Sequence, residues 1–200
     1  MKAAGLHVIG FGAGEPDFPT PQHICDAAKE AIDLGMTRYT PAAGTKELRK
    51  AICEKLRRDN DMTYTYGDIL VSNGAKHSLF NIFQAILDPG DEVLIPTPCW
   101  VSYPELVRMA GGVPVFIPAT EETNFIPTNK DIASRVTRRT KAIVITSPSN
   151  PNGSVWEQEQ LQFVADLAVS HPFFVVSDEI YEKLIYDGRK HLSIAQLGEQ

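Results

Sequence analysis

Four segments of the sequence place polar or aromatic residues at or just beyond the end of a short apolar run. They are Ser72-Asn73-Gly74, Trp100, Asn150 and Asp178. Each run is typical of a buried parallel strand, and the carboxyl ends of such strands meet at one edge of an open α/β sheet, where ligands bind. A single strand-ending aspartate is more often a helix cap or a turn former. Together, the four segments indicate one ligand site.

The segments offer complementary interactions. Gly74-Ala75-Lys76 opens a helix directly after a strand, which leaves backbone N–H groups free to bind a phosphate at the positive end of the helix. Trp100 presents a flat face for stacking, and Asn150 can donate a hydrogen bond to a phenolate oxygen. Asp178 can pair with a protonated ring nitrogen, and Tyr181 can place a hydroxyl over the same ring. A phosphate, a flat ring, a phenol and a basic ring nitrogen occur together in pyridoxal phosphate.

Alternating apolar patterns position these segments. Strands are predicted over 69–71, 92–95, 113–117, 142–146 and 173–176. Helices are predicted to start at Thr20-Pro21 and at Thr45, and to span 75–87, 100–110, 128–136 and 157–168. This alternation predicts an α/β fold with a mainly parallel sheet and helices on both faces.

The composition excludes several classes of function. The 200 residues carry 19 Lys+Arg against 25 Asp+Glu, a net charge of −6, which argues against non-specific binding to nucleic acid or to a membrane surface. The cysteines Cys25, Cys53 and Cys99 are too far apart for a zinc site or a disulfide framework. The sequence shows neither a membrane-spanning stretch nor the layout of a signal peptide. We therefore expect a cytoplasmic protein without a metal.

Six motifs, in order, resemble the class I aminotransferases, specifically the aspartate aminotransferase branch of prokaryotes. They are Gly14-Glu15-Pro16-Asp17-Phe18, Tyr39-Thr40-Pro41-Ala42-Ala43-Gly44, Ser72-Asn73-Gly74-Ala75-Lys76, Trp100-Val101-Ser102-Tyr103-Pro104, Ser149-Asn150-Pro151-Asn152-Gly153 and Ser177-Asp178-Glu179-Ile180-Tyr181. The resemblance implies the large domain of the fold type I pyridoxal-phosphate-dependent transferases. Residues 1–44 would form an N-terminal segment with substrate and dimer loops, and residues 45–200 a partial cofactor-binding domain.

The resemblance also implies roles for single residues. Gly14 matches the backbone contact for the substrate's α-carboxylate, and Trp100 and Asn150 would also face the substrate. Tyr39 matches a tyrosine that reaches the phosphate of the neighbouring subunit, which implies a homodimer with shared active sites.

The remaining matches concern the cofactor. Gly74, Ala75 and Lys76 match the phosphate cup, and Trp100 matches the aromatic residue stacked on the pyridine ring. Asn150 and Tyr181 match the donors to the phenolate oxygen, and Asp178 matches the partner of the ring nitrogen. Asp178 and Tyr181 are therefore the catalytic residues expected in this chain.

The implied reaction moves an amino group from an amino acid, aspartate or a similar one, to a 2-oxo acid. In the family a lysine beyond the aspartate forms a Schiff base with the cofactor, and an arginine binds the α-carboxylate. Neither is matched before Gln200, and Lys183 and Lys190 stand in the wrong positions. We therefore expect a fragment with an incomplete sheet. A pyridoxal-phosphate lyase or synthase of the same fold and a non-catalytic cofactor-binding or dimerisation fragment remain alternatives.

Overall fold

The computed structural model describes residues 5, 7–8, 14 and 18–197. The chain divides into two compact units, one up to residue 41 and one from residue 42 onward, and each is described by itself. The first unit contains helix α1 (Gln22–Asp33). This helix follows the predicted start at Thr20-Pro21, with Pro21 as the N-cap residue and no side-chain cap. The proline ring holds φ of Pro21 at −53°, and its ψ of 137° leaves this residue just outside the helix.

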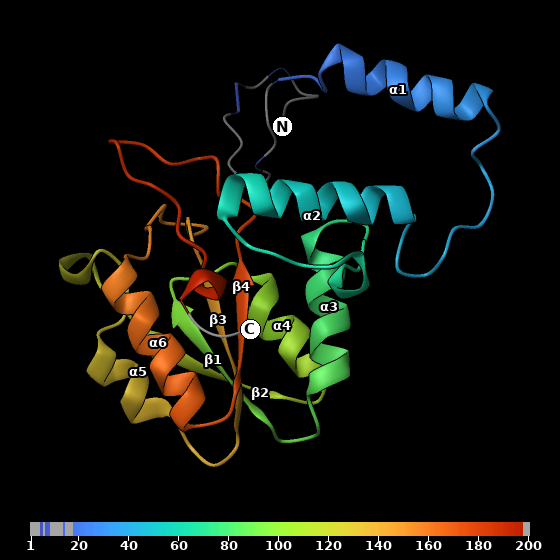
Figure 1. Ribbon diagram of the computed structural model, residues 1–200. Helices are drawn as coiled ribbons and strands as arrows, with labels where there is room; N and C mark the ends of the chain where they lie inside the picture. Colours follow the sequence, from blue (N-terminus) through green and yellow to red (C-terminus); the bar gives the residue numbers. More distant parts are fainter. Residues whose placement is uncertain (1–4, 6, 9–13, 15–17, 198–200) are drawn as a thin grey trace. The chain divides into compact units, whose positions relative to one another are not determined.

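A sheet of four parallel strands forms the centre of the second unit (Figure 1). The strands are β1 (Glu92–Thr97), β2 (Val113–Pro118), β3 (Thr140–Thr146) and β4 (Phe174–Asp178). Their order in the sheet is β2-β1-β3-β4, and all three ladders are parallel. Parallel strands that are covered on both faces are apolar along most of their length rather than alternating. This explains the continuous apolar runs of the sequence.

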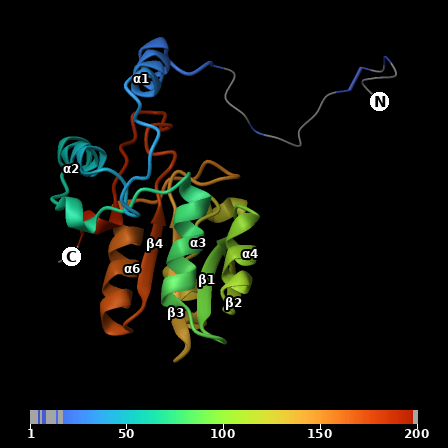
Figure 2. The ribbon, with the colours of Figure 1, turned by 90° about the vertical axis from the view of Figure 1, so that its right-hand side faces the viewer.

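Helices cover both faces of this sheet (Figure 2). They are α3 (Ala75–Ile86), α4 (Ser102–Met109), α5 (Asn129–Arg135) and α6 (Gln158–Ser170). Successive strand residues point to opposite faces: Val93 and Ile95 pack against α3 and α4, whereas Leu94 packs on the side of α5 and α6. The predicted α/β architecture is confirmed.

Helix α2 (Lys46–Asn60) begins at Thr45, whose hydroxyl accepts a hydrogen bond from the Leu48 N–H, as predicted. Short 3₁₀ helices span Tyr66–Asp68 (η2), Glu121–Thr123 (η3) and Ile194–Gln196 (η4). The end of α2 contacts the segment that follows β4, because Asn60 donates a hydrogen bond to Glu182. No helix in the described part of the chain is long and apolar enough to cross a membrane.

The prediction of a strand over Ile69–Val71 is wrong. No ladder includes these residues, the Val71 N–H donates to the Ala43 carbonyl at 3.0 Å, and Leu70 is 60% exposed. An extended apolar segment becomes a strand only beside a neighbour that satisfies its backbone groups. Among the described residues β4 is an edge strand, which agrees with the expected incomplete sheet.

Gly44 fixes the loop that binds Val71. Its φ is +95°, and a Cβ added there would lie 2.7 Å from Cγ2 of Val71. We expect Gly44→Ala to lower the free energy of unfolding by about 1–3 kcal/mol, because it combines a steric overlap with an unfavourable φ.

Gly90→Ala is the matched control, since Gly90 has a φ of +91° and no atom within 4 Å of an added Cβ. Urea unfolding of both variants measures the difference. Equal losses would show that contact with Val71 contributes nothing.

Candidate active site

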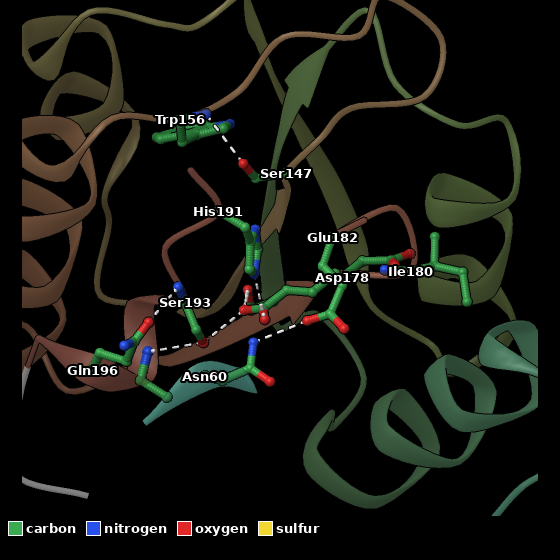
Figure 3. Close-up of polar contacts among 12 residues, drawn as sticks. Asn60, Ser147, Trp156, Asp178, Ile180, Glu182, His191, Ser193 and Gln196 are labelled. Atoms are coloured by element: carbon green, nitrogen blue, oxygen red, sulfur yellow. Dashed lines mark hydrogen bonds and ion pairs between the residues drawn. The ribbon is translucent and has the colours of Figure 1, made fainter. Parts of the chain in front are cut away.

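Asp178 ends β4 and lies beside Thr146, its partner in the parallel ladder with β3. One carboxylate oxygen, Oδ2, accepts a hydrogen bond from the Tyr103 hydroxyl at 2.7 Å. The other, Oδ1, accepts one from the backbone N–H of Ile180 at 3.2 Å (Figure 3). Asp178 therefore forms a local turn contact and also presents a half-buried carboxylate at the edge of the sheet.

Tyr103 was not among the predicted site residues. Tyr103 belongs to α4, and its side chain is buried. Its hydroxyl lies 2.7 Å from the Thr146 hydroxyl and 2.7 Å from Oδ2 of Asp178. Burial raises the pKa of Tyr103 far above its usual value; the hydrogen bond with Thr146 opposes this, and the negative charge of Asp178 adds to it. The phenol therefore keeps its proton and donates a hydrogen bond to the carboxylate. In the sequence, the one signal for Tyr103 as a site residue was its position three residues after Trp100, a predicted site residue.

Trp100 contacts both Tyr103 and Lys76. The Trp100 ring packs edge-on against Tyr103, with ring centroids 5.5 Å apart and planes at 83°. The Lys76 ammonium lies 5.0 Å from the centroid of the Trp100 ring, within the range of a cation–π interaction. The structure thus joins the helix predicted to bind a phosphate with the ring predicted to stack on a cofactor.

Gly74 forms the start of α3. It is the N-cap residue at φ +87°, and an added Cβ would meet no atom within 4 Å, so the backbone is open on that side. The first N–H groups of a helix have no partner within it, and those of Ala75 and Lys76 belong to this first turn. This geometry suits an anion.

Asn150 and Tyr181 are both half-buried in loops that leave the same edge of the sheet. Asn150 follows β3, in a loop closed by a hydrogen bond from the Gly153 N–H to the Ser149 carbonyl at 2.8 Å. Tyr181 follows β4, in a turn closed by the Glu182 N–H and the Glu179 carbonyl at 3.0 Å.

Gly14 and Tyr39 belong to the first unit, and both are exposed. Their roles toward the site therefore stay predictions. Residues 9–13 and 15–17 of the glycine-containing loop lie outside the described residues.

A small cavity adjoins Tyr103 and Thr146, and its lining also includes Cys99, Ser149 and Trp156. Burial raises the pKa of the Cys99 thiol. A thiol with a raised pKa is a poor nucleophile, so Cys99 contributes packing rather than chemistry.

Comparison with known proteins gives matches along nearly the whole chain. The family model for aminotransferase class I and II matches residues 7–200. The chain is 53% identical to an aspartate aminotransferase of Bacillus sp. (strain YM-2), over 100% of this chain and 51% of that protein. It is 50% identical to a probable aspartate/prephenate aminotransferase of Thermus aquaticus, over 94% of this chain and 49% of that protein.

A solved structure shows the same fold. The aspartate aminotransferase from Thermus thermophilus with maleate superimposes with a TM-score of 0.95 at 48% identity, covering 98% of this chain and 51% of that one. The chain therefore spans about half the length of the relatives that it matches. Its parallel sheet is that of the fold type I aminotransferase large domain, and the chain belongs to the class I and II aminotransferase family.

Proposed function

We propose that this chain provides the cofactor-binding part of an aminotransferase that moves an amino group between an amino acid, aspartate or a similar one, and a 2-oxo acid. The observation that carries the proposal is the Asp178 carboxylate, which a buried, protonated Tyr103 orients at the carboxyl edge of the sheet. The relatives that are 53% and 50% identical to this chain are an aspartate aminotransferase and a probable aspartate/prephenate aminotransferase, which supports the choice of substrate.

The residues at this edge fit pyridoxal phosphate. The open backbone at Gly74 and the first turn of α3, with Ala75 and Lys76, would hold the phosphate. The ring of Trp100 would stack on the pyridine ring, and Asn150 and Tyr181 would donate hydrogen bonds to the phenolate oxygen. Asp178 would pair with the ring nitrogen.

The chemistry that pyridoxal phosphate supplies when bound is a sink for the electrons released at the substrate's α-carbon. Asp178 would make that sink effective by keeping a proton on the ring nitrogen. Tyr103 would hold the carboxylate in position, because its own raised pKa prevents it from giving up its proton. Thr146 in turn fixes the Tyr103 hydroxyl.

The Schiff-base lysine is expected outside these 200 residues. Lys183 does not suit that role, because its ammonium binds the Asp59 carboxylate at 3.0 Å. Lys190 is exposed in a loop. We also propose a cytoplasmic homodimer in which Tyr39 contacts the phosphate of the neighbouring subunit and Gly14 contacts the α-carboxylate of the substrate.

The full-length gene product, incubated with aspartate and 2-oxoglutarate, should form oxaloacetate and glutamate in equal amounts and no ammonia. Both products are quantified by coupled assays. Release of ammonia would instead favour a lyase of the same fold.

The 200-residue chain alone tests the expectation, shared with the non-catalytic alternative, that it contains no Schiff-base lysine. After incubation with pyridoxal phosphate and reduction with borohydride, intact-mass measurement should show unmodified protein. A stable pyridoxyl-lysine adduct would contradict our placement of the lysine.

Asp178→Ala in the full-length product should lower kcat by about two to three orders of magnitude, the loss typical when one preorganised electrostatic partner is removed. Circular dichroism should stay unchanged, because Asp178 lies at a strand end rather than in the core. Near-normal turnover would overturn the assignment of Asp178.

Tyr103→Phe tests the orientation of Asp178. This change keeps the ring against Trp100 and removes the hydroxyl, so we expect kcat/KM to fall about tenfold, the value of one hydrogen bond to a charged group. Tyr186→Phe is the control, since Tyr186 is 72% exposed. The same kcat/KM in both variants would show that Tyr103 is not needed.

A further inference from the structure

Tyr181 lies in a four-residue turn that starts directly after Asp178. The N–H of Glu182 donates to the carbonyl of Glu179 at 3.0 Å and closes this turn, so Tyr181 is its third residue. Ile180, the second residue, is 63% exposed. Apolar packing of Ile180 therefore does little to hold the turn, and the position of the turn must depend on other contacts.

The first residue of the turn is held by its side chain. Glu179 Oε1 accepts hydrogen bonds from the hydroxyls of Ser177 and Ser193, each at 2.7 Å, and Oε2 lies 2.9 Å from Nε2 of His191. The side chain of His191 is only 9% exposed, and Ser193 is buried. Glu179 thus joins β4 to a segment that returns to the sheet twelve to fourteen residues later.

This carboxylate remains ionised. Burial would raise the pKa of Glu179, but the hydrogen bonds from His191, Ser177 and Ser193 together outweigh burial and leave the pKa below its usual value. An ionised acceptor makes these hydrogen bonds stronger than those between neutral groups.

The last residue of the turn is held from a different direction. Glu182 forms an ion pair with Lys55 and accepts a hydrogen bond from Asn60 at 2.9 Å, and both partners lie on α2. The next residue, Lys183, binds Asp59 of the same helix. Figure 3 shows Glu182 beside Asn60, with His191 and Ser193 nearby.

The two carboxylates and the His191 imidazole lie within 4.8 Å of one another. Such a group could bind a metal ion, but Lys55 already pairs with Glu182 and the donors around Glu179 already satisfy its oxygens. The arrangement is therefore that of an anchor built from the protein's own groups.

We propose that Glu179 and Glu182 are positioning residues that fix the two ends of this turn, and so fix the Tyr181 hydroxyl and the Asp178 carboxylate relative to the cofactor. This inference rests on the proposed function. A turn anchored at one end only would let the tyrosine move, and small displacements of a positioned group weaken both binding and catalysis.

The test uses the full-length gene product and compares Glu179→Ala with Glu92→Ala. Glu92 is buried and accepts hydrogen bonds from Thr137 and Arg139 at 2.6 Å each, but it begins β1 at the opposite end of the sheet. Both changes therefore remove a glutamate with little exposed side chain, 19% for Glu179 and 6% for Glu92, together with its hydrogen bonds.

We expect Glu179→Ala to raise the Kd of pyridoxal phosphate about tenfold, the loss of one charged hydrogen bond, and to shift the absorbance spectrum of the bound cofactor and its pH titration. Glu92→Ala should lower the Tm without the cofactor but keep the wild-type Kd and spectrum. Equal Tm losses with wild-type Kd and spectrum in both variants would overturn the proposal.

Glu179→Gln and Glu182→Ala refine the test. In Glu179→Gln the amide carbonyl can still accept hydrogen bonds from Ser177 and Ser193, so its Kd for pyridoxal phosphate should lie closer to wild type than that of Glu179→Ala. Glu182→Ala should weaken pyridoxal phosphate binding as much as Glu179→Ala does. Should Glu179→Ala fail to fold, Ser177→Ala removes one of the three hydrogen bonds, and an unchanged Kd and spectrum there would contradict the proposal.

The wild-type protein separates this inference from the proposed function. A wild type that neither binds pyridoxal phosphate nor transaminates would overturn the proposed function. A wild type that does both, with Glu179→Ala matching it in Kd and spectrum, would overturn only the positioning role.

Discussion

The parallel ladder between β3 and β4 sets Thr146 beside Asp178, and the Ser147 N–H extends it by donating to the Asp178 carbonyl at 3.2 Å. Because parallel strands end at the same edge, this register brings the loops after β1, β3 and β4 together. A shift of one residue would turn Asp178 toward the opposite face. The Tyr103 hydroxyl can therefore contact Thr146 and Asp178 together only in this register.

The partly buried carboxylates at this edge of the sheet are each stabilised by several polar partners. Removing a carboxylate from water is costly unless donors replace the lost solvation. Asp178 accepts hydrogen bonds from a phenol and a backbone N–H. Glu179 interacts with two hydroxyls and an imidazole. Glu182 pairs with a lysine and accepts a hydrogen bond from an amide. Three acidic residues within five positions are thus each satisfied by different elements, which fixes this segment without a large apolar contact.

Much of the fold could be predicted from the sequence, because the patterns that define it are local. Apolar runs and helix caps gave β1 to β4 and the start of α2 at nearly the observed positions. The strand expected at Ile69–Val71 failed, although its composition is as apolar as that of β2. Strand formation needs a partner in the right place, and composition alone does not report one.

By itself, the sequence determined the class of fold, the family and the placement of Asp178 at a strand end, since periodicity and motif order are written along the chain. Only the tertiary structure decided that Tyr103 orients Asp178 from 75 positions away and that His191 and α2 anchor the turn of Tyr181. Hydrogen bonds between distant segments depend on how helices pack on the sheet, and no local pattern encodes that packing.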